Sequence, residues 1–170
     1  MMKTTFAASY ANYLKTRSRL LAVYFCHFGN MIRNNPVHLI RSIAYQIAEN
    51  MPASRQHIFA ALNSGSYLED EPVSNLFREI IVKPLTKCPP PSLNMVIVID
   101  AIDEIDQAKS RSALLDIFSY NVPTEVPSLQ SVLPLQLRAL AYIWHSRCVK
   151  YYYKPTSNLS FVLVTVTLLD

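Results

Sequence analysis

An uninterrupted apolar run, MVIVI, occupies residues 95–99 and ends abruptly at Asp100. A run of this length without polar alternation predicts a strand that is buried on both faces, as in a parallel sheet. A second run, LLAVYFCHF at residues 20–28, has the aromatic and β-branched content of another such strand. The two runs favour folds in which a sheet is covered on both sides by other elements.

Apolar residues at helical spacing surround the two predicted strands. Residues 4–14 predict a short amphipathic helix. Asn35 and Pro36 supply an N-cap side chain and a preset φ for a first helical turn, and an apolar stripe then continues to Met51. Further helices are predicted over residues 53–62, 73–81 and 107–118. The order of helix, strand, helices, strand and helix predicts an α/β sandwich with a mostly parallel sheet.

The composition divides the chain into three parts. Residues 1–119 carry the α/β pattern. Residues 120–157 contain several prolines and the sole tryptophan, and we interpret them as an atypical insertion or as translated intron sequence. Residues 158–170 include LSFVLVTVTLL, which predicts a further sheet strand over residues 159–169.

The overall composition restricts the class of protein. The 170 residues are 51% hydrophobic and 16% charged, which suits one globular domain and excludes intrinsic disorder. Three cysteines, far apart and outside any C-x-x-C pair, argue against a disulfide framework or a structural zinc site, and none of the four histidines is assigned to catalysis. Several aromatic residues are expected in the core: Tyr10, Tyr24, Phe25, Tyr45 and Phe77.

The basic residues are concentrated at one end of the chain. The formal net charge is +4, and residues 1–48 contain no acid. Such a stretch is typical of a mitochondrial presequence and would also suit nucleic acid, but it continues into a predicted strand and helix, and no nucleic-acid-binding motif accompanies it. No apolar run reaches the roughly 18 residues of a membrane span. We therefore expect a cytoplasmic protein with no membrane or nucleic-acid partner.

Acidic residues follow the strand at residues 95–99. An acid at the carboxyl end of a parallel strand lies where α/β sheets bind ligands, and Asp100 could hold Mg²⁺ there through water. Asp103 and Glu104 are spaced to orient an attacking water in phosphoryl transfer. The alternative is a strand followed by an acidic helix cap, with Asp106 as the N-cap.

The N-terminal helix opens with Lys3, Thr4 and Thr5. In the phosphate-binding loop G-x-x-x-x-G-K-[ST], the lysine reaches the β- and γ-phosphates and the hydroxyl binds Mg²⁺ at a helix N-terminus. Lys3 and Thr4 match those last two positions, but Met2 stands at the place of the final glycine. The two glycines of the chain cannot form a complete glycine-rich loop.

Together these segments resemble a known family. KTTFA, LLAVYFCHF, NNPVHLIRSIAYQIAENMP, FREIIVKPL and VIVIDAIDEID look like the NACHT and nephrocystin-3-like N-terminal NTPase domains that are common in fungal STAND proteins. The resemblance covers residues 3–119 and implies a P-loop NTPase fold, in which bound ATP or GTP with Mg²⁺ switches an oligomerising receptor in signal transduction.

The resemblance also implies roles for particular residues. Lys3, Thr4 and Thr5 would bind the nucleotide as remnants of the Walker A motif, and Thr4 would also contact Mg²⁺. Asp100 would be the Walker B acid that holds Mg²⁺. Asp103 and Glu104 would be the catalytic acids of hydrolysis or sensing.

Two departures from the family pattern qualify the expected activity. The first strand and glycine loop are missing, and Val166 and Thr167 stand where the family has a sensor arginine. We therefore expect a partial three-layer P-loop sandwich that starts inside a larger domain, with impaired nucleotide binding and hydrolysis. Other protein chains, including related STAND proteins, are the expected partners. The alternative is a non-catalytic protein-interaction module.

Overall fold

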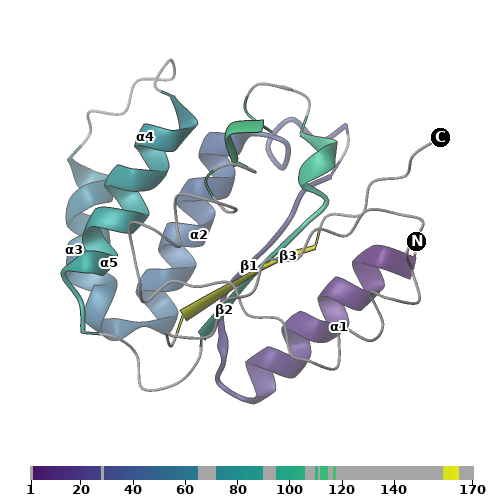
Figure 1. Ribbon diagram of the computed structural model, residues 1–170, viewed down its shortest axis with the longest axis horizontal. Coiled ribbons are helices and arrows are strands. Elements are labelled where there is room, and N and C mark those ends of the chain that lie inside the picture. Colours follow the sequence, from purple (N-terminus) through teal and green to yellow (C-terminus); the bar gives the residue numbers. More distant parts are fainter. Residues whose placement is uncertain are drawn as a thin grey trace.

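The computed structural model describes residues 2–27, 29–64, 72–89, 95–105, 110, 112–114, 117 and 159–164. Side chains are described for these residues except 2–4, 6, 103 and 159–164. The fold is α/β (Figure 1), and its elements in chain order are α1 (Met2–Thr16), β1 (Leu20–Phe25), α2 (Pro36–Asn50), α3 (Pro52–Asn63), α4 (Val73–Phe77), the π turn η1 (Arg78–Val82), α5 (Lys83–Thr86), β2 (Met95–Asp100), the 3₁₀ turn η2 (Ile102–Glu104) and β3 (Leu159–Val164).

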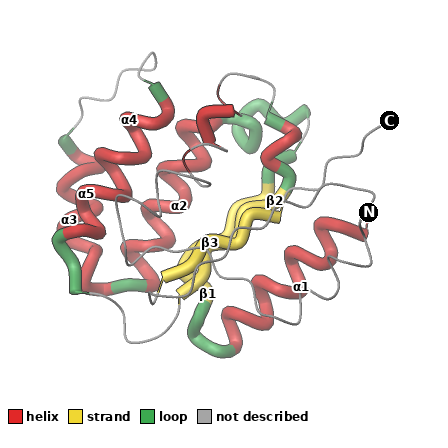
Figure 2. The backbone as a smooth tube through the Cα atoms, viewed as in Figure 1, coloured by secondary structure: helices red, strands yellow, loops and turns green. Residues whose placement is uncertain are grey.

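The sheet has three parallel strands in the order β1, β2, β3. Every residue of the central strand β2 is buried, which explains why its sequence shows no polar alternation. Successive side chains of β2 point to opposite faces. Val96 and Val98 pack with α1 in one cluster, and Ile97 and Ile99 pack with the remaining helices in another. Helices therefore cover both faces of the sheet, α1 on one side and α2 to α5 on the other (Figure 2).

A short turn joins α1 to β1 and makes the two elements antiparallel. Ser18 adopts the left-handed conformation with φ 54°, Arg19 N–H donates to the oxygen of Leu14 at 2.9 Å, and Ser18 N–H donates to that of Lys15 at 3.0 Å. This pair of bonds is a Schellman motif with serine at the position that glycine usually occupies. Because the turn is so short, the N-terminal end of α1 lies at the carboxyl end of the strands.

Helix α2 forms as its sequence predicts. The side chain of Asn35 accepts from the N–H groups of Val37 at 2.8 Å and His38 at 3.3 Å, and Pro36 is the first helical residue. The predicted apolar stripe is buried, and its members are Leu39, Ile40, Ile43, Ala44, Ile47, Ala48 and Met51. This stripe joins the larger of the two core clusters, which includes the apolar residues of α3 to α5.

Some sequence expectations differ from the structure. The first strand was expected over residues 20–28, but β1 ends at Phe25. Tyr45 was expected in the core, but 51% of its surface is exposed, so that prediction was wrong. Tyr24 and Phe77 are buried as predicted.

Other expectations fall partly or wholly outside the described residues. Within the predicted helix 107–118, residues 110 and 112–114 are helical and Leu114 is buried. The proposed insertion at residues 120–157 lies outside the described residues. β3 lies within the stretch for which a strand was predicted. Among the helices that the structure describes, none combines the length and apolarity needed to cross a bilayer.

Candidate functional site

The central strand β2 carries an acid at its carboxyl end. Asp100 is the last residue of the strand and is 3% exposed. Its register partners are Phe25 on β1 and Val164 on β3, and its backbone oxygen accepts from Cys26 N–H at 3.0 Å. The strand pairing on both sides fixes the backbone of this acid within the sheet, at the edge where parallel sheets bind ligands.

The chain turns sharply after Asp100. Ala101 has φ 59° and ψ 40°, a left-handed conformation that residues other than glycine rarely adopt. The one-turn helix η2 follows, and the buried side chains of Ile102 and Ile105 anchor its two ends in the core. The turn thus keeps the backbone of Asp103 and Glu104 at the carboxyl edge of the sheet. Glu104 is partly exposed there.

The first turn of α1 approaches the same edge. Lys3, Thr4 and Thr5 lie in this turn, and the Thr5 side chain is exposed. Figure 1 places the N-terminal end of α1 toward the end of the sheet at which β2 finishes. A helix N-terminus attracts anions because its N–H groups and dipole are directed outward. The structure therefore brings both predicted groups to one edge at the level of the backbone, and the side chains of Lys3, Thr4 and Asp103 lie outside the described part.

A loop that the sequence analysis did not assign to the site also lies at this edge. It follows β1 and spans residues 26–35. The side chain of Asn30 accepts from the N–H groups of Ile32 and Arg33, both at 3.1 Å, and this turns the loop back toward α2. The apolar side chains of Met31 and Ile32 are left 89% and 62% exposed.

The buried side chain of Tyr24 holds the end of this loop through its hydroxyl group. Its hydroxyl lies 3.1 Å from Nδ1 of His38 and donates to the backbone oxygen of Arg33 at 3.3 Å. The pKa of Tyr24 is raised to about 12, mainly by burial and further by repulsion from the Cys26 thiolate, while the Arg33 guanidinium opposes the rise. No signal in the sequence pairs Tyr24 with His38, because the two side chains meet only when α2 packs on β1.

The groups at this edge suit the Mg²⁺ site of a nucleotide-binding protein better than its phosphate-binding loop. A carboxylate at a buried strand end, such as that of Asp100, is the kind of oxygen ligand that holds Mg²⁺ through water. A phosphate cradle needs successive backbone N–H groups in a tight turn. The sequence has only two glycines, Gly29 and Gly65, and both come after α1 in the sequence. Within the described part of the chain, no group of three or more metal-binding side chains occurs.

These features define an α/β protein with a parallel sheet whose carboxyl edge gathers acidic residues and a helix N-terminus. The nephrocystin 3, N-terminal family model matches residues 1–132, more than half of the chain. The chain therefore belongs to the nephrocystin 3 N-terminal family. No match was found among curated proteins or among solved structures.

Proposed function

We propose that the chain is a nucleoside-triphosphate-binding switch domain of the STAND type, related to fungal NACHT P-loop NTPases. The observation that carries the proposal is the buried Asp100 at the carboxyl end of the central parallel strand. Family membership and the position of the first turn of α1 at the same edge support it. The sheet edge is the general ligand-binding position of such folds.

Each of the residues has a distinct task in this proposal. Asp100 holds Mg²⁺ through water, and the hydroxyl of Thr4 is a second ligand. Lys3 reaches the β- and γ-phosphates of ATP or GTP, with Thr5 beside it in the first turn of α1. Bound Mg²⁺ would neutralise charge on the phosphates. Asp103 and Glu104 orient the attacking water or sense the γ-phosphate.

The glycine content limits the strength of this activity. Without a glycine turn, few backbone N–H groups can surround the phosphates. We therefore propose that nucleotide binding and hydrolysis by this chain are impaired, although the acids are retained. The proposed partners are other protein chains, including related STAND proteins.

A non-catalytic protein-interaction module is the second candidate function. The exposed apolar side chains of Met31 and Ile32, on a loop at the carboxyl edge, favour it. In this alternative the buried acid of β2 has a structural role only. The two candidates differ in whether a nucleotide stabilises the chain.

Thermal unfolding with and without millimolar MgATP or MgGTP tests the proposal. A ligand at ten times its dissociation constant adds about 1.4 kcal/mol to the free energy of unfolding. For a chain of this size that raises the melting temperature by roughly 3–6 °C. We expect a rise that Lys3→Ala and Asp100→Asn each remove, while Lys87→Ala, away from the edge, retains it. No rise with either nucleotide would favour the interaction module.

A further inference from the structure

The outer edge of β1 has backbone groups that do not face β2. Along a strand, alternate backbone groups point to opposite sides. Cys26 N–H donates to Asp100 on β2, so the N–H and C=O of Val23, three residues earlier, are directed to the outer edge. When no other group occupies such a strand edge, it is a template for pairing with another strand.

Side-chain amides from α2 occupy this outer edge. Val23 N–H donates to Oε1 of Gln46 at 2.9 Å, and Nε2 of Gln46 donates to the oxygen of Val23, also at 2.9 Å. One helical turn later, Nδ2 of Asn50 donates to the oxygen of Leu21 at 2.9 Å. The amide of Gln46 therefore makes the pair of bonds that a peptide group of a neighbouring strand would make.

Helix α2 holds these amides in line with β1. Gln46 and Asn50 are four residues apart, so they lie on one stripe of the helix, and Val23 and Leu21 are two residues apart on the outer side of the strand. Nε2 of Gln46 also lies 3.3 Å from both the backbone oxygen and the hydroxyl of Ser42. These contacts fix the glutamine rotamer that reaches Val23.

We propose that Gln46 and Asn50 close the outer edge of β1, and that without them this edge becomes an interface with β1 of a second copy of the chain. The sequence of β1 indicates that its pairing partner would be the same strand of a second copy. Its sequence, Leu20–Phe25, is LLAVYF, without charge, proline or glycine, which is the composition that favours pairing between identical strands. The inference concerns the opposite side of β1 from β2 and does not depend on nucleotide binding.

The experiment compares the whole chain with its Gln46→Met variant, which removes the amide and keeps a side chain of similar length. Amide hydrogen exchange is measured at Val23 and at Tyr24, and sedimentation velocity is measured over a range of protein concentrations. At low concentration we expect the Val23 amide to exchange about tenfold faster in the variant, because its N–H loses the hydrogen bond to Oε1 of Gln46. Tyr24, whose N–H alternates to the inner side, should be unchanged. At high concentration the variant should dimerise, and the protection of Val23 should return.

Two further variants make the test specific. Glu49→Met, on the exposed side of α2, introduces the same side chain and should behave like the unaltered chain. Gln46→Lys can still donate to the oxygen of Val23 but cannot accept from its N–H, so it tests the closure even if Gln46→Met does not fold. It should expose the Val23 amide without dimerisation, because an edge lysine opposes strand pairing. Unchanged protection of Val23 in both Gln46 variants, or a deprotected Gln46→Met chain that stays monomeric at every concentration, overturns the proposal.

Discussion

At the scale of single residues, buried polar groups join elements that the sequence keeps apart. The hydroxyl of Tyr24, on a residue that is 6% exposed, meets His38 of α2 and the backbone of Arg33. Both contacts are satisfied together when His38 carries its proton on Nδ1. Buried hydroxyl groups are costly without partners, so these contacts fix how the loop after β1 returns to α2.

The first prediction concerns the alkaline stability of this contact. Tyrosine ionises near pH 10 when unfolded, and the pKa of Tyr24 in the folded chain is about 12. The folded state therefore binds the proton more tightly, so this contribution to stability is complete below pH 10 and is lost as the pH rises from 10 through 12. Tyr24→Phe should lower the free energy of unfolding by about 1 kcal/mol at neutral pH and flatten its fall over that window. Urea denaturation at a series of pH values measures both effects.

The matched control for this prediction is Tyr45→Phe. Tyr45 is half exposed on α2, where its ring lies 6.0 Å from that of Phe59 between centroids. We expect the control to retain the stability and alkaline profile of the unaltered chain. If the free energy of unfolding of Tyr24→Phe falls as steeply between pH 10 and 12 as that of the unaltered chain, other groups cause the fall and the prediction is wrong.

At the scale of elements, the segment from α4 to α5 is one helix with a local expansion. Lys83 N–H donates to the oxygen of Arg78, five residues earlier, which is the bond of a π turn. Pro84 follows directly, and proline in an α-helix lacks an N–H and collides with the carbonyl four residues before it. The wider turn lets the helix continue to Thr86, where the threonine hydroxyl donates to the oxygen of Lys83 at 2.9 Å.

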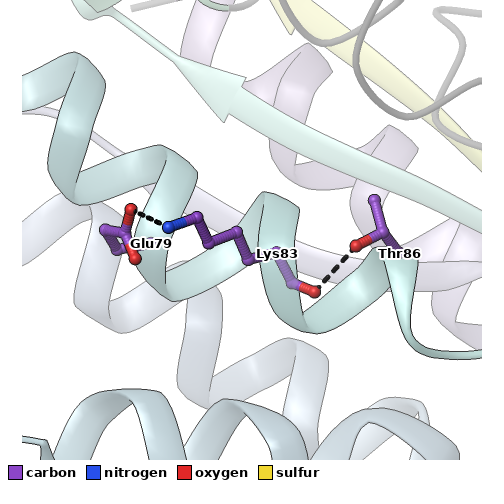
Figure 3. A network of polar contacts seen from close by, with 3 residues as sticks. All are labelled: Glu79, Lys83 and Thr86. Carbon is purple, nitrogen blue, oxygen red and sulfur yellow. Dashed lines mark hydrogen bonds and ion pairs between the residues drawn. The ribbon is translucent and has the colours of Figure 1, made fainter.

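The second prediction compares a buried and an exposed residue of this segment. Ile80 is fully buried, whereas Lys83 and Glu79 form an ion pair with side chains 57% and 35% exposed (Figure 3). Ile80→Ala should cost about 2–5 kcal/mol because it leaves a cavity in the main core. Lys83→Ala should cost less than about 0.5 kcal/mol because solvent screens the pair. Chemical denaturation of the two variants measures the difference, and comparable losses would contradict this account.

At the scale of the whole molecule, the sheet separates two cores of unequal size. The smaller core lies between α1 and the sheet, and its buried members are Ala7, Ala11, Leu14, Val96 and Val98. Among the described side chains of α1, Leu14 is the one large residue that is buried in this cluster. The larger core on the opposite face contains the stripes of α2 to α5. The described side chains of α1 therefore bury far less apolar surface than those of α2 do.

The third prediction follows from this imbalance. Leu14→Ala should release α1 before the rest of the chain unfolds, so amide exchange should accelerate within α1 and remain slow in α2. Ile43→Ala, in the larger core, should instead lower the protection of α1, α2 and the strands together, with a loss of about 2–5 kcal/mol. Exchange measured residue by residue distinguishes the two patterns, and uniform acceleration in Leu14→Ala would contradict the separation of the cores.

The sequence by itself determined the elements whose signals are local. The side-chain cap of Asn35 and the apolar stripe to Met51 specify α2, because capping and helical periodicity depend only on near neighbours. The continuous apolar runs specify β1 and β2 as strands, of which β2 is buried throughout and β1 only in part, and the position of Asp100 at a strand end follows directly. The family was also recognisable, since its motifs are linear in the sequence.

Only the tertiary structure decided the relations between distant residues. Periodicity did not identify Tyr45 as exposed, and no local pattern pairs Gln46 with Val23 or Tyr24 with His38. Such contacts depend on the rotation and position of α2 on the sheet, which the whole core sets through close packing. The same holds for the candidate site. The acids can be read from the sequence, but their placement at one edge with the first turn of α1 results from the parallel pairing of the strands and the short turn at Ser18.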